Sequence, residues 1–262
     1  MKPVFNLEEW WPWYDRINKL FNYDMNEDQR ATDILSGLIS KRAIHPESME
    51  KFITHKPVLV FGAGPSLEEN LYQLQKEGLL EKFSIISADG ATTALLKVVE
   101  LTPQFIVSDL DGKIEDLLNA NRLGSTMVIH GHGDNITQLK KYVPKFVNII
   151  GTTQVKPTIN VYNFGGFTDG DRAVFFAASM KPSMLVLAGM DLGQKIGKYS
   201  KEKIGSQEEK ILKLKVCKEL LEWLASKVEM PLYNVTGRSE NIRRFKNVSS
   251  SELVKIINSN LY

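Results

Sequence analysis

Residues 57–68 read Pro-Val-Leu-Val-Phe-Gly-Ala-Gly-Pro-Ser-Leu-Glu, an apolar run followed by a glycine-rich turn and the opening of a helical pattern. An apolar run without polar alternation is typical of a strand covered on both faces. The glycines let the backbone approach a ligand closely, and free amides at a helix start form an anion site. Gly62, Gly64 and Ser66 are therefore candidate nucleotide contacts, with a purely structural turn as the alternative. Leu67 replaces the third glycine of the dinucleotide fingerprint, which disfavours NAD.

Similar β-rich runs recur after this one, at 83–87, 105–107, 127–130, 147–150, 161–164 and 184–188, with helical patterns such as 67–78 and 92–100 between them. Alternating strands and helices predict an α/β fold, a Rossmann-like, mostly parallel sheet with helices on both faces. Ligands bind such sheets at the carboxyl ends of the strands.

The predicted α/β core covers residues 56–205, between a helical N-terminal segment (1–55) and a C-terminal segment (206–262). In the C-terminal segment, the patterns predict a helix over 207–228, a strand over 231–235 and a closing helix after 249–251. Charged, glycine-punctuated residues 193–205 predict a mobile surface loop, conceivably a lid. Trp10, Trp11 and Trp13 favour packing against the core or a subunit, with stacking on a flat heterocycle as the alternative.

The charge is balanced, with 33 basic and 31 acidic residues and a net charge of +2, which argues against a broad nucleic-acid or membrane surface. We see no signal peptide and no apolar run approaching about 18 residues. Cys217 is the only cysteine, so an intramolecular disulfide is impossible and a reduced setting is favoured. The expectation is a soluble, cytoplasmic protein, with a homodimer left open.

Several acidic turns follow the predicted strands or open predicted helices. The sharpest is Ser108-Asp109-Leu110-Asp111-Gly112, because residues two apart in an extended chain project to the same side and can share a cation. Mg²⁺ takes oxygen ligands at about 2.0–2.1 Å, and phosphate oxygens and water complete its octahedron. The acidic turns therefore indicate metal-assisted chemistry on a nucleotide, against the alternative of structural loop aspartates.

Asp89 and Gly90 follow the run 83–87, where the carboxylate could bind a ribose or a heterocycle or could cap a helix. Thr168-Asp169-Gly170-Asp171-Arg172 opens another helix, where carboxylates gain from the helix dipole. Arg172 could pair bidentately with a phosphate, or with an aspartate in a surface ion pair.

His130, His132 and Asp134 alternate with glycines in His-Gly-His-Gly-Asp-Asn. A zinc site usually needs three or four convergent ligands, and the remaining histidines and Cys217 lie in other segments. We expect the imidazoles to contact phosphate or to orient Asp134, with a structural histidine pair as the alternative.

Taken in order, these motifs resemble the archaeal-type 6-hydroxymethyl-7,8-dihydropterin pyrophosphokinase family, which is similar in its acidic motifs to thiamine pyrophosphokinases. The resemblance covers nearly the whole chain and rests on five motifs: Gly62-Ala63-Gly64-Pro65-Ser66-Leu67, Asp89-Gly90-Ala91, Ser108-Asp109-Leu110-Asp111-Gly112, the His130 to Asn135 run and Gly166-Phe167-Thr168-Asp169-Gly170-Asp171-Arg172-Ala173. In thiamine pyrophosphokinases an Asp-Phe-Asp-Ser element and a later Thr-Asp element bind Mg²⁺; the matching positions here are Asp109, Asp111 and Asp169. Leu110 and Gly112 depart from that pattern, which weakens thiamine as acceptor more than Mg-ATP as donor.

The resemblance implies Mg²⁺-dependent transfer of diphosphate from ATP to the hydroxymethyl group of 6-hydroxymethyl-7,8-dihydropterin, with release of AMP, in folate or methanopterin biosynthesis. It implies that Asp109, Asp111 and Asp169 hold Mg²⁺, that Asp134 contacts metal or water, and that Arg172 contacts phosphate. Asp171 would orient or deprotonate the hydroxyl group. Two alternatives remain, a nucleotide-sugar-dependent transferase linked to surface glycosylation and a non-catalytic nucleotide-binding module.

Overall fold

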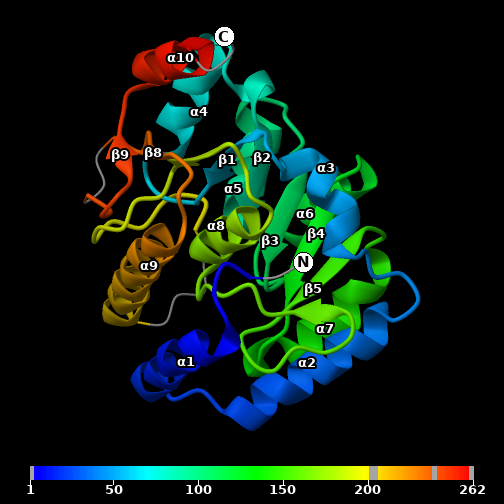
Figure 1. Cartoon of the computed structure of the whole chain (residues 1–262). Coiled ribbons are helices and arrows are strands. Elements are labelled where there is room, and N and C mark those ends of the chain that lie inside the picture. Colours follow the sequence, from blue (N-terminus) through cyan, green and yellow to red (C-terminus); the bar gives the residue numbers. More distant parts are fainter. Residues whose placement is uncertain (1–2, 201–205, 238–240, 260–262) are drawn as a thin grey trace.

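A single parallel sheet organises the protein, whose computed structural model describes residues 3–200, 206–237 and 241–259 (Figure 1). In this part of the chain the sheet has nine strands in the order β6-β5-β4-β3-β2-β1-β7-β8-β9. The strands are β1 (Pro57–Phe61), β2 (Ser84–Ala88), β3 (Phe105–Ser108), β4 (Thr126–His130), β5 (Ile149–Thr152), β6 (Val161–Tyr162), β7 (Met184–Ala188), β8 (Leu232–Asn234) and β9 (Lys246–Asn247). The predicted α/β fold is therefore confirmed.

The helices connect the strands and extend the chain at both ends. They are α1 (Leu7–Phe21), α2 (Met25–Ile39), α3 (Glu50–Ile53), α4 (Leu67–Lys76), α5 (Asp89–Val98), α6 (Ile114–Arg122), α7 (Ile136–Tyr142), α8 (Asp169–Ser179), α9 (Gln207–Lys227) and α10 (Ser250–Ser259), with 3₁₀ turns η1 (Pro46–Met49), η2 (Leu80–Lys82), η3 (Gly133–Asn135) and η4 (Val143–Lys145). Among the described residues, no helix is long and apolar enough to cross a membrane.

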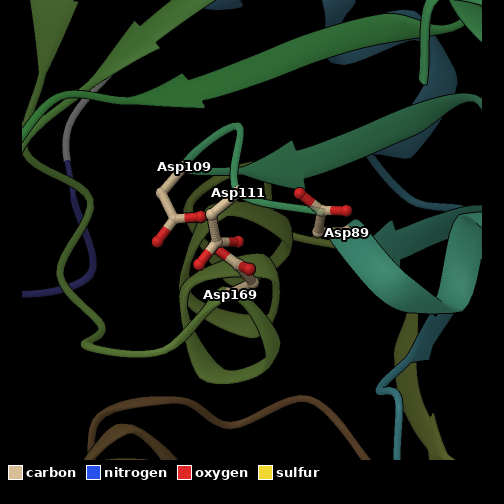
Figure 2. Close-up of side chains that lie close together, drawn as sticks. All are labelled: Asp89, Asp109, Asp111 and Asp169. Atoms are coloured by element: carbon tan, nitrogen blue, oxygen red, sulfur yellow. The ribbon is translucent and has the colours of Figure 1, made fainter. Parts of the chain in front are cut away.

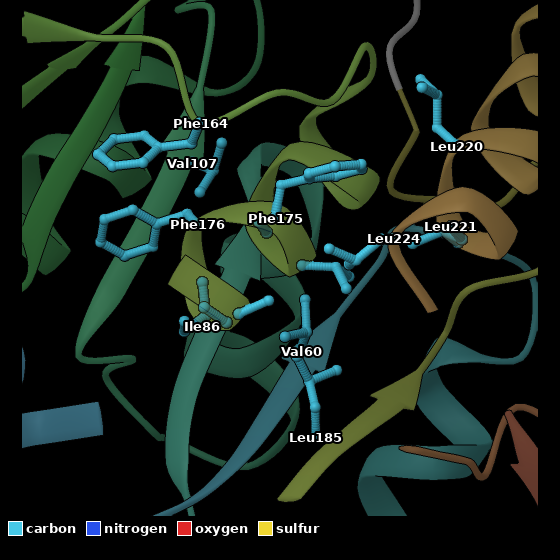
Figure 3. Close-up of a cluster of buried hydrophobic side chains, with 14 of the residues drawn as sticks. Val60, Ile86, Val107, Phe164, Phe175, Phe176, Leu185, Leu220, Leu221 and Leu224 are labelled. Carbon is cyan, nitrogen blue, oxygen red and sulfur yellow. The ribbon is translucent and has the colours of Figure 1, made fainter. Parts of the chain in front are cut away.

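Side-chain alternation along the strands divides the core between the two faces of the sheet. Val60, Ile86 and Val107 pack on the face covered by α1, α8 and α9. On α8, Phe175 faces α9, while Phe176 points the other way and lies beside Phe164 (Figure 3). The alternate strand residues pack against α4, α5 and α10 near β1 and β7, and against α2, α6 and α7 near β3 to β5. This two-sided burial explains why the central strands lack polar alternation.

Three differences from the predicted strands lie near the sheet edges. The run 147–150 predicted a strand, but β5 is Ile149–Thr152, because Val147 is 59% exposed and precedes the sheet. The strand predicted over 161–164 ends at Tyr162, and β9 was not predicted because its two residues, Lys246 and Asn247, are exposed and polar. The strands β8 and β9 follow residue 206 and join the same sheet as the strands of the middle segment. The predicted boundary between the middle and C-terminal segments at residue 206 stays a prediction.

The N-terminal tryptophans pack against the core of the protein. Trp10 is fully buried, and its indole N–H donates a hydrogen bond to the Gln154 carbonyl at 2.7 Å. The ring centroid of Trp13 lies 5.7 Å from that of Trp223 on α9. The packing interpretation is thus confirmed for Trp10, and these contacts tie α1 to the core.

The strand order reverses around β1, because β2 pairs with one side of it and β7 with the other. In open parallel sheets, a crevice for ligands opens at this reversal, outside the carboxyl ends of the strands. The turns after β1, β2, β3, β4 and β7 therefore share one edge of the sheet, and the predicted site residues lie in or beside them.

Candidate active site

Four aspartate side chains from different elements converge at this edge. One carboxylate oxygen from each of Asp89, Asp109, Asp111 and Asp169 lies within 4.8 Å of the others. Asp109 and Asp111 follow β3, while Asp89 and Asp169 begin α5 and α8 (Figure 2). All donors are oxygens, which suits a hard divalent cation. The structure thus brings together the three predicted metal ligands, and it adds Asp89.

The turn that carries Asp109 and Asp111 is not an extended chain. Leu110 adopts a left-handed conformation with φ of +66°. Its backbone N–H donates to Ser108 Oγ at 2.8 Å, and its side chain is buried against the core near α2, α6 and α7. Strand alternation was therefore the wrong reason for expecting the two carboxylates to meet, because a buried turn brings them together.

Asp89 is held by contacts from the neighbouring strand and turn. Its Oδ2 accepts a hydrogen bond from Ser108 Oγ at 2.5 Å and another from Gly112 N–H at 3.3 Å. The N-cap position of α5 belongs to Ala88, and no side-chain capping bond is made there. A Cβ on Gly112 would lie 1.8 Å from Asp89 Oδ1, so glycine at 112 allows the two turns to meet.

Asp171 and Arg172 lie behind the carboxylate cluster. Asp171 is fully buried, and its oxygens accept hydrogen bonds from Phe167 N–H at 2.8 Å, Thr168 N–H at 2.7 Å and Thr168 Oγ at 2.5 Å. These bonds form the capping box of α8, although burial raises the pKa of this carboxyl group. The arrangement gives Asp171 a structural role, and its predicted contact with the substrate hydroxyl group stays a prediction.

Arg172 is only 1% exposed, and its guanidinium donates to the carbonyls of Gly165 and Phe167 at 3.4 and 3.3 Å. Burial lowers its pKa, while Asp171, Asp169 and Asp109 oppose that shift. The predicted contact of Arg172 with phosphate stays a prediction. In the protein itself, the guanidinium holds the turn before Asp169, and its positive charge limits the mutual repulsion of the nearby carboxylates.

The histidine turn continues the site beyond β4. His132 Nε2 lies 3.5 Å from Asp109 Oδ2, and His132 Nδ1 lies 4.0 Å from Asp134 Oδ2. His130 stacks on His132 with ring centroids 5.5 Å apart, and burial lowers the pKa of His130 well below its ordinary value, so its ring is neutral. The pair thus combines a structural histidine with one that connects Asp109 and Asp134.

Two polar residues that sequence reasoning missed hold this turn in place. Asn135 donates to the carbonyls of Asp109 and His130 at 2.8 and 2.7 Å. Asp28 on α2 is buried and accepts hydrogen bonds from Gly133 N–H at 2.8 Å and Tyr14 Oη at 2.7 Å. Asn135 was visible as the last residue of the histidine motif, whereas no local pattern marked Asp28.

The glycine-rich turn after β1 meets the segment after β7. Ser66 donates its backbone N–H and its Oγ to Asp191 Oδ2 at 3.0 and 2.7 Å, so this carboxylate occupies the start of α4. A Cβ on Gly64 would lie 2.2 Å from Asp191, and one on Gly90 would lie 1.9 Å from the Tyr199 carbonyl. In this structure both glycines therefore accommodate residues 191–200. Residues 193–200 of that segment belong to the predicted 193–205 loop, and residues 201–205 lie outside the described ranges.

Comparison with known proteins identifies close relatives of the chain. The family described as MptE-like, 6-hydroxymethylpterin diphosphokinase MptE-like, matches residues 38–197. Three curated relatives are named 6-hydroxymethyl-7,8-dihydropterin pyrophosphokinase. They come from Methanothermobacter thermautotrophicus (42% identical, covering 83% of this chain and 94% of the relative), Pyrococcus furiosus (46%, 83% and 93%) and Methanocaldococcus jannaschii (41%, 86% and 98%).

The fold is also similar to the solved structure of the MAf glycosyltransferase from Magnetospirillum magneticum AMB-1. The TM-score is 0.55 at 15% identity, and the match covers 84% of this chain but 37% of that one. At this identity the likeness concerns the fold alone, because one fold hosts many chemistries.

Proposed function

The chain belongs to the MptE-like 6-hydroxymethylpterin diphosphokinase family, and from this membership we propose how its carboxylate cluster works. The protein is a 6-hydroxymethyl-7,8-dihydropterin pyrophosphokinase that uses ATP as co-substrate. It transfers the terminal diphosphate of ATP to the pterin hydroxymethyl oxygen: a bond forms from that oxygen to the β-phosphorus, and AMP leaves. The observation that carries the assignment of the site is the convergence of four carboxylates at the sheet edge.

Asp89, Asp109, Asp111 and Asp169 would hold Mg²⁺. The donor set fits this ion, because every side chain offers an oxygen and the oxygens lie close enough to share one centre. When bound, the metal supplies positive charge to the phosphate oxygens and thereby stabilises the charge of the transferred group.

The protein's own contribution is mainly positioning, as in other phosphoryl transfers. Ser108 and Gly112 orient Asp89 through its Oδ2, and Asn135 fixes the backbone of Asp109. Arg172 keeps positive charge under the carboxylates. The nucleotide would lie toward the strand-order reversal, where Gly64 and Ser66 meet Asp191 and Gly62 lies against Gly189. We also infer a cytoplasmic location, since the relatives are named as enzymes of a small-molecule substrate.

Turnover with defined products tests this function. Incubation with Mg²⁺, ATP and 6-hydroxymethyl-7,8-dihydropterin is expected to yield AMP and the pterin diphosphate in equal amounts. ADP as product, or no turnover with a folded protein, would contradict the proposal. Asp33→Asn on the exposed face of α2 is a suitable control, because it removes a carboxylate far from the acidic turns in sequence and outside the cluster.

The nucleotide-sugar alternative gains little from the comparisons, because the likeness to the MAf glycosyltransferase is one of fold. A non-catalytic module predicts metal-dependent ATP binding without AMP formation, so the same assay separates it from the pyrophosphokinase.

A further inference from the structure

Six residues on the side of the carboxylate cluster toward β4 are called the circuit below: Asp109, His132, Asp134, Tyr23, Phe167 and Asp169. Asp109 contacts His132 at 3.5 Å, and His132 reaches Asp134 at 4.0 Å. Burial raises the pKa of Tyr23, Lys213 opposes that shift through its charge and a hydrogen bond, and the negative charge of Asp134 adds to it. The Tyr23 ring lies 6.3 Å from the Phe167 ring, and Phe167 is two residues before Asp169, which returns the circuit to the cluster.

The members of the circuit combine flat apolar surface with one accessible acid. Tyr23 and Phe167 are half-buried, and Phe21 backs them with its ring centroid 4.9 Å from that of Phe167. The Asp134 side chain is 75% exposed, although its Oδ2 lies 4.0 Å from His132 Nδ1. Aromatic faces bind planar heterocycles by stacking, and an accessible carboxylate pairs with two adjacent N–H donors.

An unused hydrogen-bonding atom adjoins the same group. His130 is 4% exposed, and its Nδ1 has no hydrogen-bond partner among the described residues. A buried polar atom without a partner costs free energy, so a ligand that supplied a partner would recover it. Because His130 stacks directly on His132, this atom belongs to the same flank.

We propose that this circuit is the acceptor subsite, in which Asp134 pairs with the amino and ring N–H groups of the pterin, and Tyr23 and Phe167 stack on its ring plane. This inference rests on the proposed function and adds the location and the recognition chemistry of the acceptor. The 2-amino-4-oxopyrimidine edge presents the two donors side by side, which a single carboxylate can accept together. The opposite end of the heterocycle, with its hydroxymethyl group, then lies at Asp109 and Asp169.

The dimensions and the topology agree with this orientation. The path from Asp109 to Asp134 spans one imidazole ring and two contacts of 3.5 and 4.0 Å, a span comparable to the length of a two-ring heterocycle. The glycine-rich turn lies on the other flank of the cluster, near β1 and β7. Donor and acceptor would therefore approach the carboxylates from opposite sides, as displacement at phosphorus with attacking and leaving oxygens roughly in line requires.

Equilibrium binding of the pterin without ATP, followed by its fluorescence, tests the subsite directly. We expect Asp134→Asn to weaken binding about 10- to 100-fold, the effect of losing a bidentate charged pair. Phe167→Leu should weaken binding by a similar factor through lost stacking, while Phe167→Tyr retains it. Asp33→Asn, an exposed carboxylate of α2 outside the circuit, is the matched control and should bind like the wild type.

An acceptor analogue without the 2-amino group provides the sharper readout. The wild type should bind it about 10- to 100-fold more weakly than the natural acceptor, and Asp134→Asn should lose this discrimination. The subsite would be overturned if Asp134→Asn bound the pterin as tightly as the wild type and kept the same preference for it over the analogue, even if the wild type forms AMP. Absence of AMP formation by the wild type would instead overturn the proposed function, so the two failures are distinguishable.

Discussion

Replacing Gly112 with alanine should disrupt the carboxylate cluster by displacing Asp89. A Cβ at 112 would lie 1.8 Å from Asp89 Oδ1 and 2.5 Å from its Cγ, both far inside van der Waals contact. The Asp89 side chain is 2% exposed and bonded through Oδ2 to Ser108 and Gly112, so it has little room to rotate. Overpacking of this kind costs about 1–3 kcal/mol of folding stability.

The larger effect should fall on metal binding, because relief of the clash moves the Asp89 carboxylate away from the other three carboxylates. Disturbing the groups that orient a ligand lowers metal affinity about 10- to 100-fold. We would titrate Mg²⁺ or Mn²⁺ calorimetrically and measure AMP formation across metal concentrations. Gly112→Ala should need correspondingly more metal for half-maximal turnover.

Gly37→Ala is the matched control, since a Cβ there meets nothing within 4 Å and the residue lies inside α2. This control should gain up to about 1 kcal/mol of stability from helix propensity without any change in metal affinity. Metal affinity equal to that of the wild type in Gly112→Ala would refute the assignment of Asp89 to the metal site.

Three further substitutions separate catalytic from structural roles. Asp109→Asn should lower turnover at least 100-fold with an unfolding free energy within about 1 kcal/mol of the wild type, and equal losses in both would remove Asp109 from the site. Asp171→Ala should instead cost about 3–5 kcal/mol in urea unfolding, because it removes the cap of α8 and leaves the buried charge of Arg172 less compensated; a loss below 1 kcal/mol would contradict this role. Burial lowers the pKa of His130 well below 6.5, so as the pH falls the unfolded chain takes up a proton that the native ring does not. The free energy of unfolding is therefore retained above about pH 6.5 and falls below it, by up to about 1.4 kcal/mol per pH unit. His130→Asn should flatten this slope, and an unchanged slope in urea unfolding would assign it to other groups.

The central strands, and with them the turns at their carboxyl ends, could be predicted from sequence because strands buried on both faces have continuous apolar sequences. Every residue of β4 and β7 is buried, and such runs stand out against the charged helices between them. The edge strand β9 has no such apolar sequence, because its two residues are exposed and its pairing comes from tertiary contact with β8.

The roles of Asp89 and Asp191 could not be predicted from the local sequence around them. Each follows a buried strand, but the contacts that define their roles come from elsewhere in the fold: Ser108 and Gly112 for Asp89, and Ser66 for Asp191. The glycine-rich turn predicted an open anion site, and no pattern in that turn could indicate that a carboxylate 125 positions away meets the same amide.

The buried side chain of Leu110 stabilises the turn that carries Asp109 and Asp111. A left-handed conformation costs a non-glycine residue about 1–2 kcal/mol, and glycine at 110 would avoid most of that cost. Full burial of a leucine side chain returns about 1.5–3 kcal/mol, so the strained turn is stabilised by the apolar core that it touches. The carboxylates on both sides of Leu110 are thereby fixed by packing against the core near α2, α6 and α7, and metal binding does not have to order them. A preorganised set of like charges is costly without a cation, which is why the buried charge of Arg172 lies behind it.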